Sequence, residues 1–344
     1  MQGRLRSPSD QPKCMRGGMN RAMSEGAMID RTPGNRPPHL GERCRTMVSL
    51  WDKPEYFFQP ARLWHRIGIP FGRRPVCTSV RLPWGVEIET MPGDSLDRLL
   101  RRCGVFDLIV TETLWRLATR GSLAIDCGAN IGYMSSLLAR RLGPTGQVHA
   151  FEPDLRVLPV LQRNARRWAA FRELAGVTVH GAAVADRVGT AIFEDSAVES
   201  VSGRLVDGAS GRSGREAPVT TLDAALAGLI GLRPVSVLKI DAEGAKMQVL
   251  RGARQLLSSG QVGNVVFEDH GKYPTPEMRE LESLGFALFA LSRSFRRVAL
   301  RAPAEDAKLR KWESPSYLAT RDPAKIWAGF ARPGWGCLGA KTHQ

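Results

Sequence analysis

The sequence predicts a three-layer, Rossmann-like α/β fold, and three observations support this prediction. A short apolar run at 123–125 leads into a glycine-rich turn and then into an amphipathic helix over 133–142, which ends at Gly143-Pro144. Further buried strands are expected at 148–151 and 235–240. A helical pattern follows each of them, and this alternation is typical of a mostly parallel sheet with helices on both faces.

The chain before and after this main region has a different composition. Residues 1–48 are rich in Arg, Pro, Gly and Ser without periodicity, which predicts a disordered basic tail. Residues 49–104 are expected to form a small extension that packs on the core, with an aromatic cluster and a β-hairpin over 80–90. The main domain is predicted over 105–322, and 323–344 is expected to be an irregular C-terminal tail.

The remaining elements follow from apolar periodicity and turn residues. The outer face of the helix over 154–170 carries several arginines, which are expected to be solvated. A loop is expected over 203–216, which is rich in Gly, Ser and Arg. Further helices are expected over 94–102, 106–120, 154–170, 245–258 and 276–284. Further strands are expected over 177–180, 190–193 (an edge strand), 262–267, 286–291 and 316–320, the last two as an antiparallel pair.

The glycine-rich turn has the spacing Asp126-x-Gly128-x-Asn130-x-Gly132. A dinucleotide site would show G-x-G-x-x-G instead, so the spacing disfavours a nicotinamide oxidoreductase. The glycines allow the backbone to approach a ligand closely, and the following helix offers free N–H groups. An acid before the first glycine suits a ligand with a cationic amino-acid end. Glu152 ends the next strand, where a carboxylate can accept both ribose hydroxyls.

In these residues the sequence resembles motif I of class I S-adenosylmethionine-dependent methyltransferases, and more narrowly the FkbM-type methyltransferase family. Asn130 departs from the wider pattern, but the family commonly has asparagine there. The resemblance covers roughly 105–320 and implies a seven-stranded, mostly parallel sheet with an antiparallel C-terminal strand. Further matching stretches, in order, are Phe151-Glu152-Pro153, 182–186, 221–223 and 238–244.

The resemblance implies S-adenosyl-L-methionine as the cofactor and predicts which residues hold it. Asp126 would anchor the methionine ammonium, directly or through water, and Glu152 would hold the ribose. Ala183 is small enough to admit the adenine ring. Asp186 would bond the adenine amine, or is simply a turn acid. The predicted cofactor-binding residues are Asp126, Gly128, Asn130, Gly132, Tyr133, Glu152, Pro153, Ala183 and Asp186.

Charged residues follow two neighbouring parallel strands and predict the reaction site. Buried charges are costly unless they are used or paired, and ligands of open α/β sheets lie outside the carboxyl ends of the strands. Asp241 and His270 are favoured as the group that removes a proton from the acceptor, whereas Lys239 is expected to pair with a carboxylate. A structural ion-pair network is the alternative. The predicted catalytic residues are Lys239, Asp241, Glu243, Glu268 and His270.

Composition limits the acceptor and the cellular setting. The net charge is +15 and the pI is about 10.2, but no dense basic run interleaved with aromatics occurs. This composition makes nucleic acid a less favoured partner. Given the family resemblance, the leading hypothesis is an O-methyltransferase that acts on a hydroxyl of a small molecule or glycan. The alternatives are an RNA or protein methyltransferase and a catalytically silent cofactor-binding module.

The cysteines point to a reducing compartment. The six Cys are scattered without a C-x-x-C or Cys/His cluster, so neither a metal site nor disulfides are expected, and a cytoplasmic location is favoured. No long apolar run or signal peptide is present, so no membrane span is expected. The oligomeric state stays open.

Overall fold

The computed structural model describes residues 78–194, 204–206, 214–242, 244–305 and 314–339, which all belong to one compact unit. The expectations of a basic tail at 1–48 and of an aromatic cluster at 49–76 lie outside the described residues. The division of the chain into tail, extension and main domain therefore stays a prediction. No helix in the described part is long and apolar enough to cross a membrane.

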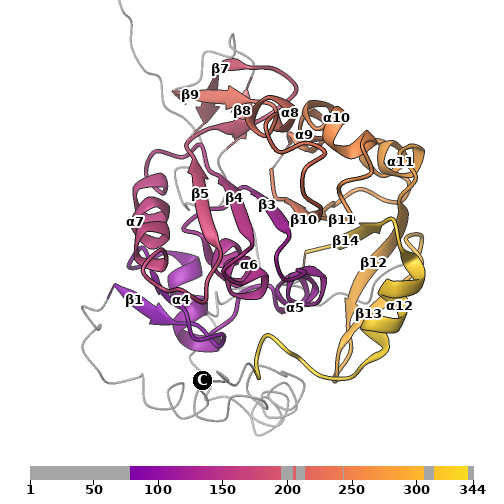
Figure 1. The fold of residues 1–344 in the computed structure, drawn as a ribbon, viewed down its shortest axis with the longest axis horizontal. Helices are drawn as coiled ribbons and strands as arrows, with labels where there is room; N and C mark the ends of the chain where they lie inside the picture. The colour runs from indigo at the N-terminus through magenta and orange to yellow at the C-terminus, as the bar shows by residue number, and fades with distance from the viewer. Residues whose placement is uncertain (1–77, 195–203, 207–213, 243, 306–313, 340–344) are drawn as a thin grey trace, which may run out of the picture. The chain divides into compact units, whose positions relative to one another are not determined.

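The main sheet has the parallel centre that the sequence predicts. Its described strands lie in the order β13-β12-β14-β11-β10-β3-β4-β5, and the neighbours from β11 to β5 run parallel (Figure 1). β14 runs antiparallel between β11 and β12. This topology confirms the Rossmann-like α/β fold class. The strands are β3 Leu123–Cys127, β4 Gln147–Phe151, β5 Gly176–His180, β10 Val235–Ile240, β11 Asn264–Glu268, β12 Ala287–Arg293, β13 Val298–Arg301 and β14 Ser316–Thr320.

The sheet has one strand more than the expected seven. β13 folds back on β12 as an antiparallel hairpin, with Arg293 opposite Val298 and Ala290 opposite Arg301. Val298 and Leu300 turn inward and are buried. Only two of its four residues face the core, so the alternation is too short for the sequence pattern to indicate a strand.

Helices cover both faces of the main sheet because alternate strand residues enter separate cores. Ala124 and Val148 belong to one core, whereas Leu123 and Ile125 belong to the other. The first core is covered by α4 Ser95–Cys103, α5 Leu108–Leu117, α6 Tyr133–Leu142, α7 Leu158–Trp168 and α12 Pro323–Ala331. The second is covered by α8 Leu222–Ala225, α9 Lys246–Gly252, α10 Arg254–Ser258 and α11 Pro276–Ser283.

A second sheet corrects two expectations. Its described strands lie in the order β6-β9-β7-β8. The expected edge strand at 190–193 is instead an interior strand, because β7 pairs with both β8 and β9. The expected loop at 203–216 contains strand at 204–206 and 214–216; such polar strands pair through their backbones and need no apolar alternation. The strands are β6 Ala183–Val184, β7 Gly189–Glu194, β8 Arg204–Val206 and β9 Gly214–Thr220.

The single helix expected over 245–258 is broken into α9 and α10. The break falls at Ala253, which has φ of −110°. Just before it, the backbone of Gly252 passes so close to Ala185 that a Cβ on the glycine would lie 1.9 Å from the Ala185 carbonyl oxygen. This contact brings the helix against the loop that follows β6 and depends on the absence of a side chain.

The expectation of an irregular chain after Asp322 is wrong. Asp322 caps α12 by accepting from the backbone N–H of Lys325 at 2.9 Å, and Pro323 begins the helix. An Asp-Pro start is a helix signal that the sequence offered. Beyond the helix, Trp335 and Cys337 are buried in the core.

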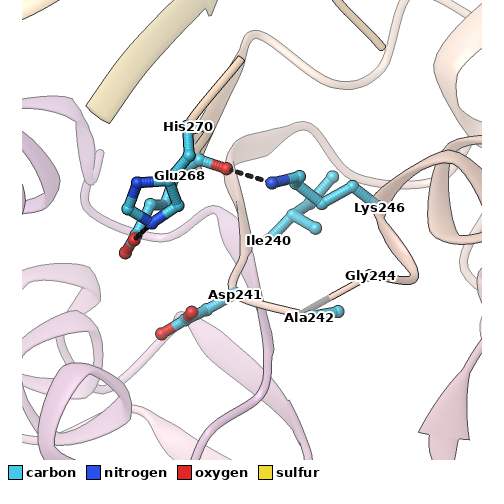
Figure 2. A pocket seen from close by; sticks show the side chains of 7 residues that line it. All are labelled: Ile240, Asp241, Ala242, Gly244, Lys246, Glu268 and His270. Carbon is cyan, nitrogen blue, oxygen red and sulfur yellow. Dashed lines mark hydrogen bonds and ion pairs between the residues drawn. The ribbon is translucent and has the colours of Figure 1, made fainter. Parts of the chain in front are cut away.

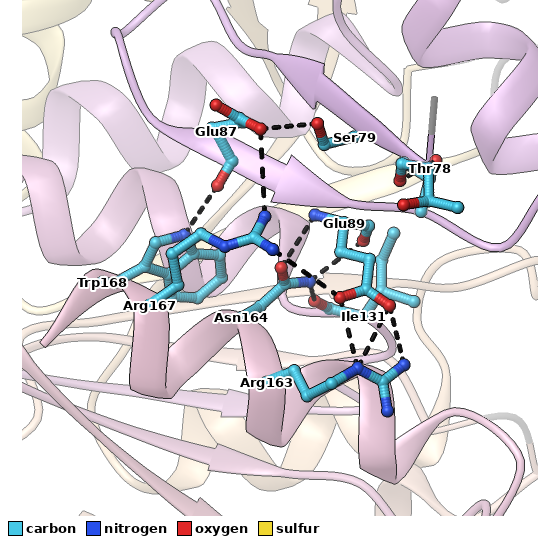
Figure 3. A network of polar contacts seen from close by, with 10 residues as sticks. Thr78, Ser79, Glu87, Glu89, Ile131, Arg163, Asn164, Arg167 and Trp168 are labelled. Atoms are coloured by element: carbon cyan, nitrogen blue, oxygen red, sulfur yellow. Dashed lines mark hydrogen bonds and ion pairs between the residues drawn. The ribbon is translucent and has the colours of Figure 1, made fainter. Parts of the chain in front are cut away.

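The N-terminal hairpin, β1 Ser79–Arg81 and β2 Glu87–Glu89, is docked on α7 (Figure 3). Asn164 bridges the backbone N–H and carbonyl of Glu89 and also donates to the carbonyl of Ile131 in the loop before α6. Trp168 donates to the carbonyl of Glu87 at 2.9 Å. Arg163 pairs with the Glu89 carboxylate at 2.7 Å, so this part of the arginine face is engaged rather than only solvated.

Candidate active site

The loop between β3 and α6 is built from residues in left-handed conformations. Gly128, Asn130 and Gly132 have φ of 77°, 51° and 92°. A Cβ on Gly128 would lie 2.1 Å from the backbone oxygen of Asp241, so only glycine fits between the ends of β3 and β10. Asn130 tolerates its conformation because its Oδ1 accepts from the N–H of Ile131 at 2.7 Å. Asparagine can therefore occupy a position where glycine is common.

Glu152 follows β4 and faces this loop from the neighbouring strand end. Its Oε2 accepts from the N–H of Asn130 at 2.7 Å, and its Oε1 accepts from the N–H of Asp154 at 2.9 Å. Burial raises the pKa of Glu152 to about 7, although these two backbone bonds lower it. Each carboxylate oxygen retains an acceptor site beyond these bonds. The arrangement therefore fits a ligand with two adjacent hydroxyls, such as a ribose.

Lys239 connects the glycine-rich loop after β3 to the end of β10. Its Nζ lies 3.0 Å from Asp126 Oδ1, 3.1 Å from the carbonyl oxygen of Gly128 and 3.3 Å from Asp241 Oδ2. The other oxygen of the fully buried Asp126 accepts from Ser135 at 2.7 Å. Both carboxylate oxygens of Asp126 are thus engaged within the protein.

The charges around Lys239 keep it protonated. Burial lowers the pKa of Lys239, but the charges of Asp126 and Asp241 outweigh burial and raise that pKa above its usual value. The ammonium is therefore a fixed cation that holds the loop. It cannot serve as a base at neutral pH.

The ends of β10 and β11 form the walls of a cavity of about 290 Å³ (Figure 2). His270 Nε2 lies 2.6 Å from Glu268 Oε1, and Lys246 donates to the backbone oxygen of Glu268 at 2.7 Å. The carboxylates of Asp241 and Glu268 project to the same side in Figure 2, away from Lys246. The cavity is lined by Ile240, Asp241, Ala242, Gly244, Lys246, Glu268 and His270.

Four of the predicted cofactor residues have different settings. Tyr133 is buried, and its hydroxyl accepts from the N–H of Phe106 at 3.1 Å, so its side chain packs against the start of α5. Ala183 is buried in β6, whereas Asp186 is exposed. Pro153 is partly buried next to Glu152. Glu243, predicted as catalytic, lies outside the described residues.

Asp107 is a carboxylate of this region that sequence reasoning missed. It caps α5 by accepting from the N–H of Val110 at 3.1 Å, and it has φ of 46°. Burial raises the pKa of Asp107 to about 6, the Val110 N–H lowers it, and the charges of Glu268 and Asp241 add to the rise. The only signal in the sequence was an acid at the start of a predicted helix, which is a common capping residue.

Comparison with known proteins gives one family. Residues 126–288 match the family model described as "Methyltransferase FkbM domain". None of the curated proteins matches the chain closely enough to count as a relative.

Three of the solved structures that resemble this chain illustrate the likeness, and each of them is distant in sequence. A methyltransferase FkbM from Methylobacillus flagellatus is 17% identical with TM-score 0.36, covering 57% of this chain and 43% of that one. A SAM-dependent O-methyltransferase from Thermotoga maritima is 15% identical with TM-score 0.35, covering 62% and 64%. Aeropyrum pernix fibrillarin with bound S-adenosyl-L-methionine is 14% identical with TM-score 0.35, covering 62% and 76%. This chain thus spans less than half the length of the FkbM structure, and at these scores the likenesses do not bear on activity.

Proposed function

Residues 126–288 of this chain are an FkbM methyltransferase domain, and from that premise we propose that the protein methylates a hydroxyl of a small molecule or glycan. The proposal rests on two features that lie next to each other at the carboxyl edge of the main sheet. A glycine turn with a ribose-compatible carboxylate adjoins a cavity that is lined by proton acceptors. S-adenosyl-L-methionine supplies the activated methyl group when it is bound.

We propose separate roles in cofactor binding for Glu152, Asp126 and Lys239. Glu152 accepts the ribose hydroxyls, because its position at the end of β4 leaves acceptor capacity on both oxygens. Asp126 acts through Lys239, which fixes the carbonyl of Gly128 and hence the shape of the loop. Ala183 and Asp186 are proposed to lie near the adenine, as the family resemblance implies.

The acceptor would lie in the cavity between the ends of β10 and β11. A hydroxyl must lose a proton as it attacks, so nearby proton acceptors favour O-methylation. Asp241 and Glu268 come from adjacent parallel strands, with Lys239 of β10 registered beside Val266 of β11. This rigid placement supports catalysis by positioning, which is worth about 7 kcal/mol or more in favourable cases.

The first test is a calorimetric titration with S-adenosylhomocysteine. We expect wild type to bind it and Glu152→Ala to bind about 10- to 100-fold more weakly, since a charged hydrogen bond contributes roughly 1.5–3 kcal/mol. Glu173→Ala removes an exposed carboxylate of the same type and should bind as wild type does. A folded wild-type protein that does not bind S-adenosylhomocysteine would contradict the proposal.

A second prediction concerns Asp241. Asp241→Asn should retain S-adenosylhomocysteine binding, because Lys239 keeps its partner Asp126, but should lose transfer of a radiolabelled methyl group to hydroxylated acceptors. A panel of sugars and hydroxylated natural products provides the acceptors. Unchanged transfer by the variant would remove Asp241 from the site.

A further inference from the structure

The cavity between the ends of β10 and β11 is lined by opposite charges on different sides. Asp241 directly follows β10 and Glu268 ends β11, whereas Lys246 begins α9. The two carboxylates project away from Lys246 (Figure 2). Ile240 and Ala242 add apolar side chains to the lining. A ligand that fills the cavity therefore meets carboxylates on one side and an ammonium on the other.

The ammonium of Lys246 is held in place at the wall of the cavity. Its Nζ donates to the backbone oxygen of Glu268 at 2.7 Å, and the residue is partly buried. Because an ammonium has three N–H donors, this single bond leaves two of them for a ligand. A backbone carbonyl fixes the position of a cation but does not neutralise its charge.

The charged groups of the cavity differ in whether they have a partner of opposite charge. Asp241 Oδ2 lies 3.3 Å from Lys239 Nζ, and Glu268 Oε1 lies 2.6 Å from His270 Nε2. By contrast, none of the carboxylates in the described part of the chain forms an ion pair with Lys246. A ligand that displaces water from the cavity lowers the local dielectric constant, so an anion placed beside this ammonium is attracted strongly.

We propose that Lys246 binds an anionic group of the acceptor, so that the substrate is an acidic hydroxy compound such as a uronic acid or a sugar phosphate. The anion lies against Lys246, and the hydroxyl that is methylated lies towards Asp241 and Glu268. This orientation keeps the anion away from the two carboxylates, which repel it. The inference rests on the proposed function and narrows the acceptor class for that same site.

Three variants separate the charge of Lys246 from its packing. Lys246→Met removes the charge but keeps a long, unbranched side chain. Lys246→Arg keeps the charge and can still donate to the carbonyl oxygen of Glu268. Lys325→Met is the matched control, because Lys325 is an exposed lysine of α12 that does not line the cavity.

The first measurement is ligand binding to the protein loaded with S-adenosylhomocysteine, followed by NMR titration. The probes are glucose, glucuronate and glucose 6-phosphate, which share a sugar ring and differ in charge. We expect wild type to bind a charged probe about 10- to 100-fold more tightly than glucose, the range of a hydrogen bond between charged groups. The tighter of the two charged probes shows whether the site takes a carboxylate or a phosphate.

The variants decide whether Lys246 is the source of this preference. Lys246→Met should abolish it, whereas Lys246→Arg and Lys325→Met should retain it. Equal affinity of wild type for all three probes would overturn the proposal, as would a preference that survives in Lys246→Met. Weaker binding of S-adenosylhomocysteine by Lys246→Met would place the ammonium at the cofactor and would also overturn it.

The second measurement compares methyl transfer to neutral sugars with transfer to their carboxylated counterparts. We expect wild type to have the higher kcat/KM for the acidic member of a pair, and Lys246→Met to lower the acidic-to-neutral ratio about 10-fold or more. A variant that slows both members equally would show a structural role only, through the bond to Glu268, and would overturn the proposal. Failure of folded wild type to bind S-adenosylhomocysteine is a separate result, which would contradict the proposed function itself.

Discussion

At the scale of single residues, the turn after β3 shows why this site needs particular side chains. Gly128 must lie between two strand ends with a left-handed φ of 77°, and no other residue avoids the Asp241 carbonyl. Asn130 also has a positive φ, and its side-chain Oδ1 stabilises this conformation by accepting from the N–H of Ile131. Sequence reasoning located both residues from their spacing, although the oxygen that Gly128 approaches belongs to Asp241, which follows β10 more than a hundred positions later.

Gly128→Ala is therefore expected to destabilise the protein and to weaken S-adenosylhomocysteine binding. The left-handed conformation alone costs on the order of 1–3 kcal/mol for a residue with a Cβ, and the clash with a backbone oxygen adds to it. Urea unfolding and calorimetric titration measure the two effects. Gly176→Ala is the control, because a Cβ there would meet nothing within 4 Å. Equal stability of the two variants would argue against the close approach of Gly128 to the Asp241 carbonyl.

At the scale of elements, α5 is held in place by the chain's C-terminal segment. Glu112 is 1% exposed; its Oε1 lies 2.7 Å from Arg116 Nε and its Oε2 accepts from the N–H of Cys337 at 2.9 Å. Arg116 also donates to the carbonyls of Gly329 and Gly334, beyond the sheet. The helix that carries Asp107 thus depends on residues that the sequence alone suggested were irregular.

Glu112→Ala should lower the free energy of unfolding by about 3 kcal/mol, because it leaves the partly buried guanidinium of Arg116 without its carboxylate and the buried N–H of Cys337 without its acceptor. Chemical denaturation measures the change. Glu305→Ala breaks an exposed pair with Arg301, 3.4 Å apart, and should cost under about 1 kcal/mol. A loss at Glu112 as small as the loss at Glu305 would show that the contact does not hold α5.

At the scale of the whole molecule, the positions of the charged side chains matter more than the net charge. The net charge of +15 raised a nucleic-acid partner as the alternative, yet Arg163 and Arg167 of α7 lie against Glu87 and Glu89 of the hairpin. Part of the basic surface thus joins elements of the fold. The buried His149 lies 3.1 Å, between ring nitrogens, from the partly buried His180; this pair joins β4 to β5 and makes stability depend on pH.

Burial, together with the charge of His180, lowers the pKa of His149 from 6.5 to about 4. The unfolded chain therefore binds more protons than the folded chain between these values, and the contribution of His149 is lost as pH falls from 6.5 towards 4. Relative to His149→Gln, wild type should lose roughly 3 kcal/mol across that window, at about 1.4 kcal/mol per unit. Denaturation curves at pH 7 and pH 4.5 test this, and a difference that does not change with pH would refute it.

The sequence by itself determined the α/β class, the glycine-rich turn, the acid after β4 and the resemblance to the family whose model residues 126–288 match, because these depend on local periodicity, on left-handed positions and on residues close together in the chain. α6 has the bounds that its pattern predicted. Only the tertiary structure decided that Lys239 holds Asp126 and Gly128, and that the C-terminal segment fastens α5. These contacts join residues far apart in sequence, and their energies depend on distance and burial, which no local pattern encodes.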